Sequence, residues 1–411
     1  MKIDAVRARF PALKRQIGGQ NIAYFDGPGG TQVPDEVIEA MRMQMVERNA
    51  NAGWNYPASH AVDAMMGEAR AAFAALYGAR AEEIVFGANM TTLTLRLAHA
   101  LGRRWTAGDE LVVTELDHHA NVDTWRMLEQ DRGVVIRVAR MRPEDGTLDL
   151  EDLEAKLNRR TRLLAIGAAS NALGTMPDVA RAARAAHDVG ALVFVDAVHY
   201  AAHERVDVRA LGADILVGSA YKFYGPHMGA AYVRDELLLS LDVPRIVTAP
   251  NDGPSRLETG TPNFECIAGG TAAARFLAQE ALPLGHERGA QLFARLWSGL
   301  ESIRGVRLYG LAPGAGRRTP TVAFTIEGVR PRDAAGALAE NAIFVSHGDF
   351  YAVSVVDRLG LRAAGGMIRA GCAVYTTEEE VDRLVDGVAA VASREIRPER
   401  AGVLNSARRR P

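Results

Sequence analysis

A lysine follows a stretch that has the pattern of a buried strand. Residues 217–229 read VGSAYKFYGPHMG and come directly after the apolar run 214–217. Lysine is among the residues least often fully buried. Taken alone, Lys222 is interpreted as an amine that reaches solvent along its apolar stem. The other interpretation is chemical, because an amine held in a cleft can bind a carbonyl group covalently.

Polar residues also follow four other predicted strands. We predict strands at 83–86, 110–115, 162–166, 191–195 and 214–218, separated by helices. In an open α/β sheet, ligands bind beyond the carboxyl ends of the strands. The candidate residues there are, in strand order, Met90 and Thr91, His118, Asn171, Asp196 and His199, and Ser219, Tyr221 and Lys222. Five strand ends are therefore expected to bring these side chains to one edge of one sheet.

This set suits pyridoxal 5'-phosphate. The cofactor needs a lysine for covalent attachment, an acid against its ring nitrogen, and a site for its phosphate. Asp196 can keep the ring nitrogen protonated, which makes the ring an electron sink. Backbone N–H groups of Met90 and Thr91, at a predicted helix N-terminus, suit a phosphate, and the Ser219 hydroxyl adds a donor.

Further contacts to the cofactor are predicted from the second, third and fourth strand ends. A histidine after the second strand can stack on the ring, and Asn171 and His199 can hydrogen-bond its 3'-oxygen. Each residue also has a structural interpretation, such as Thr91 as a helix N-cap and Asp196 as a turn cap. The chemical interpretation rests on all the roles falling on one sheet edge.

Two other kinds of site fit the sequence less well. The triplet Asp117-His118-His119 resembles a metal-binding motif, but a two-metal site needs further aspartates after other strands. The glycine-rich segment 27–30 lacks the GxGxxG spacing of a dinucleotide site. We therefore expect no metal.

The bulk composition is that of a soluble globular protein. The 411 residues are 48% hydrophobic and 24% charged, with a net charge of −2. This balance gives no reason to expect nucleic acid or an acidic membrane as a partner. No apolar run reaches the roughly 18 residues of a membrane span. We predict a cytoplasmic protein.

The order of predicted elements indicates an α/β fold with two domains. Strands that alternate with helices indicate a mostly parallel, doubly wound sheet, and nearly continuous apolar strands indicate burial on both faces. After about residue 285 the pattern becomes that of a smaller α+β domain. The predicted parts are an N-terminal segment 1–30 that packs with the small domain, a large domain 31–284, a small domain 285–400, and a flexible tail 401–411.

Six ordered motifs resemble one family. They are DHHAN (117–121), SNALGT (170–175), VDAVH (195–199), SAYKFYGP (219–226), GTPN (260–263) and IRAGCAVYTTEEEVDRL (368–384). Together they resemble the class V aminotransferase group of fold-type-I pyridoxal-phosphate enzymes. Within it, the chain is most similar to cysteine desulfurases and selenocysteine lyases.

The resemblance implies roles for individual residues. It implies Lys222 as the covalent anchor and Asp196 as the partner of the ring nitrogen. His118 is implied as the stacking histidine, with His119 as the less favoured choice. Thr91 and Ser219 would bind phosphate, and His199 stands where the family usually has glutamine.

The resemblance also implies a partner subunit and a substrate class. Thr261 would reach the phosphate of the partner subunit's cofactor, so a homodimer is expected. Arg369 would hold the α-carboxylate of an amino-acid substrate through paired hydrogen bonds.

Departures from the desulfurase pattern bear on the reaction. Tyr221 replaces a histidine before the lysine, and Tyr351 stands at the position of the catalytic cysteine on a small-domain loop. The two cysteines of the chain, Cys266 and Cys372, are expected in the core rather than as nucleophiles. Tyr351 is assigned to substrate binding. Tyr351 or His347 is also a candidate proton donor, and the alternative is that these residues only line the loop.

We therefore expect chemistry at the α-carbon that needs only the cofactor and a base. The favoured reaction is β-elimination at a C–S or other Cβ–X bond, without a persulfide cysteine. The alternatives are a class V aminotransferase or an amino-acid epimerase, and, from another class, a non-catalytic accessory protein.

Overall fold

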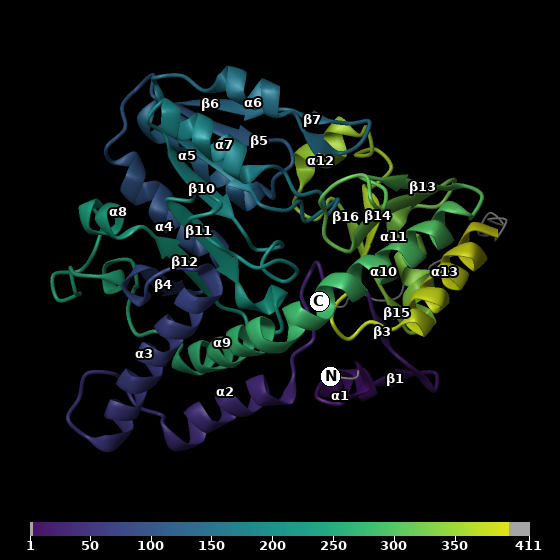
Figure 1. Cartoon of the computed structure of the whole chain (residues 1–411), viewed down its shortest axis with the longest axis horizontal. Helices are drawn as coiled ribbons and strands as arrows, with labels where there is room; N and C mark the ends of the chain where they lie inside the picture. Colours follow the sequence, from purple (N-terminus) through teal and green to yellow (C-terminus); the bar gives the residue numbers. More distant parts are fainter. Residues whose placement is uncertain (1–2, 394–411) are drawn as a thin grey trace, which may run out of the picture.

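A seven-stranded sheet forms the centre of the large domain (Figure 1). The computed structural model describes residues 3–393. The strand order is β4-β12-β11-β10-β9-β5-β6, and only β12 runs against the others. The strands are β4 (Ile84–Gly87), β5 (Glu110–Thr114), β6 (Val135–Ala139), β9 (Thr161–Gly167), β10 (Leu192–Asp196), β11 (Ile215–Ser219) and β12 (Gly229–Val233). The predicted mostly parallel sheet is confirmed, whereas the sequence analysis missed β12.

Helices cover both faces of this sheet, as the apolar strands predicted. Along β9, Leu163 and Ala165 face one apolar cluster while Leu164 and Ile166 face the other. The first cluster includes α4 (Met90–Gly102), α5 (Asp123–Arg132) and α8 (Asp235–Ser240). The second includes α3 (Pro57–Tyr77), α6 (Leu150–Lys156), α7 (Val179–Asp188) and α9 (Phe264–Phe276). The two-sided burial explains why the strands lack polar alternation.

A four-stranded antiparallel sheet forms the small domain. Its order is β13-β14-β17-β16, with bounds Val306–Tyr309, Thr321–Ile326, Met367–Gly371 and Ser346–Gly348. Helices α10 (Leu282–Glu301), α11 (Pro331–Glu340) and α13 (Glu378–Ser393) contribute to its apolar core, and α12 (Val353–Arg358) follows β16. Segment 343–348 contributes to two sheets, because β15 (Ile343–Phe344) pairs with β3 and β16 pairs with β17.

The N-terminal segment lies against both domains. Helix α1 (Ile3–Arg7) is followed by the hairpin β1 (Gln16–Ile17) and β2 (Gln20–Asn21) and by β3 (Ala23–Tyr24). Strand β3 pairs in parallel with β15. Helix α2 (Asp35–Glu47) then packs against α9 of the large domain. A further hairpin, β7 (Met141–Arg142) with β8 (Thr147–Leu148), follows β6. The predicted tail 401–411 lies outside the described residues.

A long helical segment connects the two domains. Helix α9 continues through a π-helical turn, Leu277–Ala281, into α10 (Figure 1). Helix α10 begins at Leu282. Pro283 stands in its first turn, where a missing N–H is tolerated.

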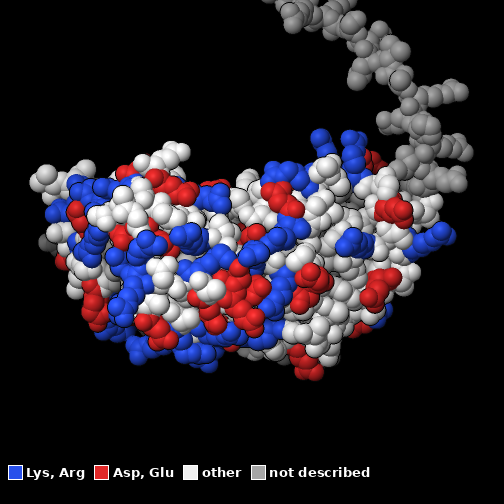
Figure 2. Space-filling model, turned by 90° about the horizontal axis from the view of Figure 1, so that it is seen from above, with Lys and Arg blue, Asp and Glu red and all other residues white. Residues whose placement is uncertain are grey.

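The surface carries both charge signs. On the face in Figure 2, lysine and arginine side chains are interspersed with aspartate and glutamate. Helices α6 and α7, for example, are joined by the Arg181–Glu154 ion pair at 2.6 Å. Among residues 3–393, no helix is long and apolar enough to cross a membrane.

Candidate active site

Two adjoining cavities lie where the strands of the large sheet end. The first, of about 860 Å³, is lined by residues after β4, β5, β9, β10 and β11, and we call it the sheet-edge cavity. The second, of about 710 Å³, is lined largely by the small-domain segment 347–366, and we call it the loop cavity. Both are lined by His118, Asn171, Tyr221, Lys222 and Tyr351. The topology thus brings five predicted site residues from four separate segments of the chain to one place.

Lys222 lies in a short helical turn directly after β11, between the two cavities. Its amine donates to the carbonyl oxygens of Pro28, at 2.5 Å, and Gly29, at 3.1 Å. Burial lowers the pKa of Lys222 to about 7, with a further lowering from Arg369 and an opposing effect of Asp196. The amine is therefore partly neutral near pH 7, as a nucleophile or base requires.

Asp196 ends β10 and is buried at the wall of the sheet-edge cavity. One carboxylate oxygen accepts the Val198 N–H at 2.8 Å. Burial raises the pKa of Asp196 to about 6, while the Val198 N–H and the Lys222 charge oppose the rise. Asp196 therefore remains mostly ionised at neutral pH and can face a protonated ring nitrogen.

The two adjacent histidines have different surroundings. His118 accepts the Ala120 N–H at Nδ1, and burial lowers its pKa to about 4, so its ring is neutral. The ring of His119 is held by Asp123 at 2.8 Å and by Ser354 at 3.1 Å. His118 lines both cavities and is the better placed of the two to stack on a ring.

The Asp117-His118-His119 triplet does not converge on one point. Asp117 is buried and accepts from the Asn121 amide at 2.9 Å and from the Thr114 hydroxyl. Within residues 3–393, no group of three or more His, Cys, Asp or Glu side chains has an arrangement that could hold a metal ion. The Asp117 side chain instead supports the turn that presents His118.

The N-terminus of α4 forms one end of the sheet-edge cavity. Asn89 caps the helix by accepting the Thr92 N–H at 2.9 Å. The Met90 N–H donates to the Ser219 hydroxyl at 3.1 Å, and Thr91 lines the cavity beside them. Helix N-termini bind anions, so this end can take a phosphate group.

His199 lies deep in the sheet-edge cavity and connects to the small domain. Its Nε2 atom lies 3.0 Å from the Thr319 hydroxyl and 3.1 Å from the Thr321 hydroxyl. Burial lowers the pKa of His199 well below its usual range, so the ring is neutral. The small domain thereby fixes the orientation of a residue that reaches the cavity from the large domain.

Tyr221 stacks against a residue that the sequence analysis missed. The rings of Tyr221 and His227 lie 4.9 Å apart with an angle of 16° between them. His227 lines both the sheet-edge cavity and a neighbouring hollow of about 370 Å³ that contains Thr261. Thr261 is exposed and does not line the sheet-edge cavity of its own chain. The sequence feature that could have identified His227 as a site residue is its position five residues after Lys222.

Arg369 lies on β17 and is buried at the wall of the loop cavity. It donates to the Asn171 carbonyl at 2.7 Å and stacks over the Phe350 ring at 4.3 Å. Burial lowers the pKa of Arg369 to about 9, while the Asp26 carboxylate opposes this. Its Nε atom has no hydrogen-bond partner among the described residues. The guanidinium group can therefore donate a further hydrogen bond to an anionic group.

The Tyr351 loop is held in a strained conformation. Phe350 and Tyr351 both have φ near 57°, which costs about 1 kcal/mol or more for each non-glycine residue. The Asn171 amide donates to the Phe350 carbonyl at 2.8 Å, and the His119 N–H donates to the Tyr351 carbonyl at 2.7 Å. The Tyr351 side chain is 72% exposed at the mouth of the site. Large-domain motifs thus hold this small-domain loop.

The residues present fit pyridoxal 5'-phosphate. Lys222 offers a partly neutral amine, Asp196 a buried carboxylate, and the α4 N-terminus an anion site. The Asn171 side-chain oxygen is buried and has no partner within the described chain. Such an unpaired polar atom in a cavity wall indicates a missing ligand. The site can hold this cofactor between Lys222, Asp196 and His118.

Comparisons with known proteins agree with this geometry. A family model described as aminotransferase class-V matches residues 23–384. A cysteine desulfurase from Dickeya dadantii is 34% identical over 94% of this chain and 96% of its own length. One from Klebsiella pneumoniae is 35% identical over 94% of this chain and 97% of its own length. The apo structure of a cysteine desulfurase from Thermococcus onnurineus matches with a TM-score of 0.89 at 29% identity, covering 95% of this chain and 98% of that chain.

Proposed function

Because the chain belongs to the class-V aminotransferase family of pyridoxal-phosphate enzymes, we propose that it cleaves a C–S or related Cβ–X bond of an amino acid by β-elimination. Its relatives are named cysteine desulfurases, which supports a sulfur-bearing substrate. The reaction proposed here passes no sulfur to a protein thiol. Transamination and epimerisation have no support from the relatives and become outcomes of the test.

The placement of the two cysteines carries the proposal. Cys372 is buried beyond the end of β17, and burial raises the pKa of its thiol to about 12. Cys266 lies on α9, and burial also raises the pKa of its thiol. Neither residue lines the sheet-edge cavity or the loop cavity. A thiol is a nucleophile only as the thiolate, so both cysteines are poorly suited to attack a substrate sulfur.

We assign the cofactor contacts by position. The cofactor, when bound, withdraws electrons from the substrate α-carbon and makes its proton acidic. Lys222 would hold the cofactor, Asp196 would pair with its ring nitrogen, and His118 would stack on its ring. The 3'-oxygen would be bound by Asn171 and His199, and the phosphate by Met90, Thr91, Ser219 and Tyr221.

The substrate contacts follow from the loop cavity. Arg369 would bind the α-carboxylate, and Lys222 lines the same cavity. Once the substrate amine has replaced Lys222 on the cofactor, the freed, neutral amine of Lys222 would take the α-proton, and the bond from Cβ to the leaving group would break with its electron pair going to the leaving group. With one water added, the products from a cysteine-type substrate are pyruvate, ammonia and the protonated leaving group. Tyr351 lines the path by which the side chain enters.

A homodimer is part of the proposal. Exposed apolar residues gather on α2 and on the segment before α3; they are Ile38, Met45, Val46, Trp54 and Tyr56. Helices α2 and α3 pack against α9, and α9 begins just after Thr261. Large exposed apolar patches indicate protein contacts. A second copy on this face would bring Thr261 to the partner subunit's cofactor phosphate. A cytoplasmic location stays a prediction.

The test is a product analysis with cysteine, selenocysteine and S-substituted cysteines. Elimination gives equal amounts of pyruvate and of free sulfide, selenide or thiol. Transfer of sulfur to a protein thiol leaves alanine instead. Pyruvate formation should remain in Cys266→Ala and Cys372→Ala and should vanish in Lys222→Ala.

Three outcomes would contradict the proposal. Alanine as the product, lost in Cys266→Ala, would show that a protein thiol takes the sulfur. Conversion of the cofactor to its amine form with a keto acid would show transamination. Solvent deuterium at Cα without bond cleavage would show epimerisation.

A further inference from the structure

Three exposed, large apolar side chains line the sheet-edge cavity. They are Leu95 on α4, Met127 on α5 and Tyr351 on the loop after β16, and they come from segments far apart in the chain. Exposed apolar side chains that gather at one cavity indicate a surface that a ligand or partner covers. None of the cofactor contacts proposed above uses Leu95 or Met127. The outer part of the cavity therefore has an apolar surface that the cofactor does not explain.

Leu95 and Met127 lie on neighbouring helices. Residues three positions apart share one face of a helix. On α4 this face carries Thr92 and Leu95, and on α5 it carries Thr124 and Met127, and all four residues line the cavity. Helices α4 and α5 pack against each other. We call the surface formed by these four side chains the α4–α5 surface.

The polar side chains on and beside this surface already have partners. The Thr92 hydroxyl donates to the Asn89 carbonyl at 2.9 Å, and the Thr124 hydroxyl donates to the Ala120 carbonyl at 2.6 Å. The ring of His119, which lines the same cavity, is bonded through both of its nitrogen atoms. A group that lies on the α4–α5 surface therefore meets apolar atoms and side-chain donors that are already paired.

The arginines of the site line the other cavity. Among the described residues, Lys222 is the one lysine or arginine that lines the sheet-edge cavity. Arg362 and Arg369 line the loop cavity, and Arg362 pairs with Asp357 at 2.6 Å. The outer part of the sheet-edge cavity therefore offers no cation to a second negative charge on a substrate.

The sheet-edge cavity is large for the cofactor and a small side chain. Pockets that take one drug-sized ligand have roughly 300–1,000 Å³. The sheet-edge cavity, at about 860 Å³, lies near the upper end of this range. The proposed cofactor contacts occupy the strand ends, which leaves the α4–α5 surface and the Tyr351 ring uncovered. The unsubstituted thiol of cysteine is too small to cover them.

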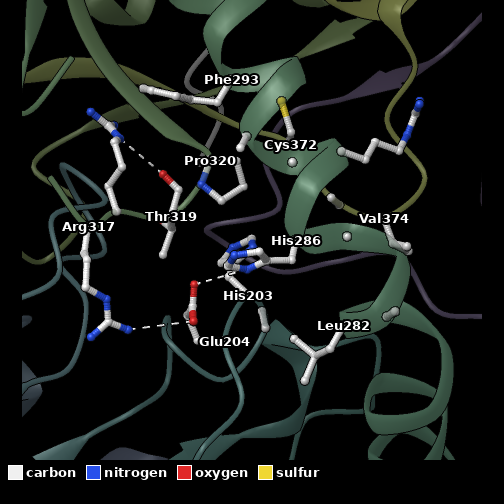
Figure 3. A pocket seen from close by; sticks show the side chains of 18 of the residues that line it. His203, Glu204, Leu282, His286, Phe293, Arg317, Thr319, Pro320, Cys372 and Val374 are labelled. Atoms are coloured by element: carbon white, nitrogen blue, oxygen red, sulfur yellow. Dashed lines mark hydrogen bonds and ion pairs between the residues drawn. The ribbon is translucent and has the colours of Figure 1, made fainter. Parts of the chain in front are cut away.

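A cavity between the two domains does not take this part of the substrate. It has a volume of about 410 Å³ (Figure 3). Its Glu204 side chain pairs with Arg317 at 3.8 Å and with His286 at 3.5 Å. It shares no lining residue with the sheet-edge cavity or the loop cavity. The α4–α5 surface, in contrast, lines the same cavity as Lys222.

We propose that the α4–α5 surface and the Tyr351 ring bind an apolar substituent on the sulfur of the substrate, so that the substrate class is cysteine with an S-alkyl or S-aryl group. This substrate class rests on the proposed function, because it names the substrate of that same site. A methionine thioether and a tyrosine ring both make favourable contacts with aromatic groups. Met127 and Tyr351 therefore suit an aromatic substituent in particular.

The chemistry of the leaving group agrees with this substrate class. Elimination breaks the Cβ–S bond, and the electron pair stays on the sulfur atom. The sulfur takes a proton and leaves as a thiol that carries the apolar group. With one water added, the other products are pyruvate and ammonia. No protein thiol is needed to accept the sulfur.

Calorimetric titration of the cofactor-loaded Lys222→Ala protein measures binding without turnover, because this variant lacks the base. The probes are S-methylcysteine, S-benzylcysteine and S-carboxymethylcysteine. One methylene group in an apolar pocket changes affinity by about tenfold or more, so we expect S-benzylcysteine to bind at least about tenfold more tightly than S-methylcysteine. S-carboxymethylcysteine should bind no more tightly than S-methylcysteine, because no arginine lines this cavity.

Matched variants locate the binding. Leu95→Gln and Met127→Gln introduce a polar side chain of similar length and similar helix propensity. Each should lower the ratio of benzyl to methyl affinity about threefold, because part of the apolar contact is lost. Leu239→Gln, at an exposed leucine of α8 outside both cavities, is the control and should keep the ratio. The ratio of kcat/KM values for the same probes in the enzyme with Lys222 intact is a second measurement.

Three results would overturn this assignment. The first is equal affinity for S-methylcysteine and S-benzylcysteine. The second is tightest binding of S-carboxymethylcysteine, which would show a cationic subsite. The third is a ratio that Leu95→Gln and Met127→Gln both leave unchanged. If light scattering also showed loss of a dimer in these two variants, the α4–α5 surface would be a contact with a second copy of the chain.

Failure of the substrate class can be told from failure of the elimination reaction. A retained preference for S-benzylcysteine without pyruvate formation would refute elimination and leave the binding surface in place. Pyruvate formed from all S-substituted cysteines at equal kcat/KM would refute the binding surface and leave elimination in place.

Discussion

The sheet-edge cavity and the Tyr351 loop are two walls of one site built in different ways. The sheet-edge wall consists of residues at the ends of buried parallel strands, such as Asp196 and Ser219. The loop wall comes from the small domain, where Phe350 and Tyr351 are in the left-handed region. The first wall fits the cofactor, and in the proposed reaction the second faces the entering substrate. This difference indicates that cofactor chemistry and substrate choice depend on separate parts of the chain.

The two walls are nevertheless joined by hydrogen bonds. The Asn171 amide holds the Phe350 carbonyl, and the Arg369 guanidinium holds the Asn171 carbonyl. A loop held at several points is a fixed wall rather than a mobile arm. Tyr351, which the sequence analysis predicted to stand at the position of the desulfurase cysteine, is therefore held in one place. The predictions below test whether cofactor chemistry depends on the sheet-edge wall and substrate choice on the loop wall.

Removal of the lysine should have the largest effect. We expect Lys222→Ala to lower kcat about 10⁴-fold, because it removes both the covalent anchor and the base. The visible band of the lysine-bound cofactor should be absent from its absorbance spectrum. Lys14→Ala, at an exposed lysine of the N-terminal segment, is the control. Normal turnover in Lys222→Ala would contradict the assignment of this wall.

A conservative change at the substrate-binding arginine should have the next largest effect. Arg369→Lys keeps the charge but loses paired hydrogen bonding, so kcat/KM should fall about 100-fold. The cofactor absorbance should stay unchanged, because Arg369 lines only the loop cavity. Arg362→Lys is the matched control, since Arg362 lines the same cavity and already pairs with Asp357. An equal loss in both variants would reject a specific role for Arg369.

The pH dependence of cofactor attachment tests the sheet-edge wall. The neutral amine of Lys222 is the reactive form, and burial lowers its pKa from 10.5 to about 7. The attachment rate should thus be constant above pH 7 and fall about tenfold per pH unit below it. Stopped-flow absorbance of the cofactor-free protein measures this rate. In Asp196→Asn the midpoint should move to lower pH, because the carboxylate raises the Lys222 pKa. A midpoint near 10 would contradict the burial effect.

The smallest effect is expected at the loop. Tyr351→Phe should change kcat less than about threefold, because the exposed ring rather than its hydroxyl forms the wall. Tyr351→Ala should alter kcat/KM unequally among substrates with small and large side chains. Steady-state kinetics with several S-substituted cysteines measure both. A 100-fold loss of kcat in Tyr351→Phe would instead identify the hydroxyl as the proton donor.

Motif spacing predicted the sheet edge better than the loops. Lys222, Asp196 and His118 follow strands whose apolar runs are easy to recognise. The carboxyl ends of parallel strands lie at one edge of the sheet, so these three residues were expected to lie together. Strand β12 was missed, because its sequence, Gly-Ala-Ala-Tyr-Val, begins with three residues that are depleted in strands. His227 lies just before this strand and was missed with it. Asp26 and the carbonyls of Pro28 and Gly29 come from a segment whose position depends on β3 pairing with β15.

The sequence by itself determined the fold class, the cofactor and the residues at the strand ends. The apolar periodicity and the order of the polar residues can be read along the chain. Because the sheet is buried on both faces, its parallel strands have one arrangement, and the polar residues at their carboxyl ends meet at one edge. Only the tertiary structure decided how the Tyr351 loop is held and how the small domain orients His199. These features depend on contacts between residues far apart in the chain, such as Asn171 with Phe350 and His199 with Thr319. Such contacts arise only when the two domains pack together.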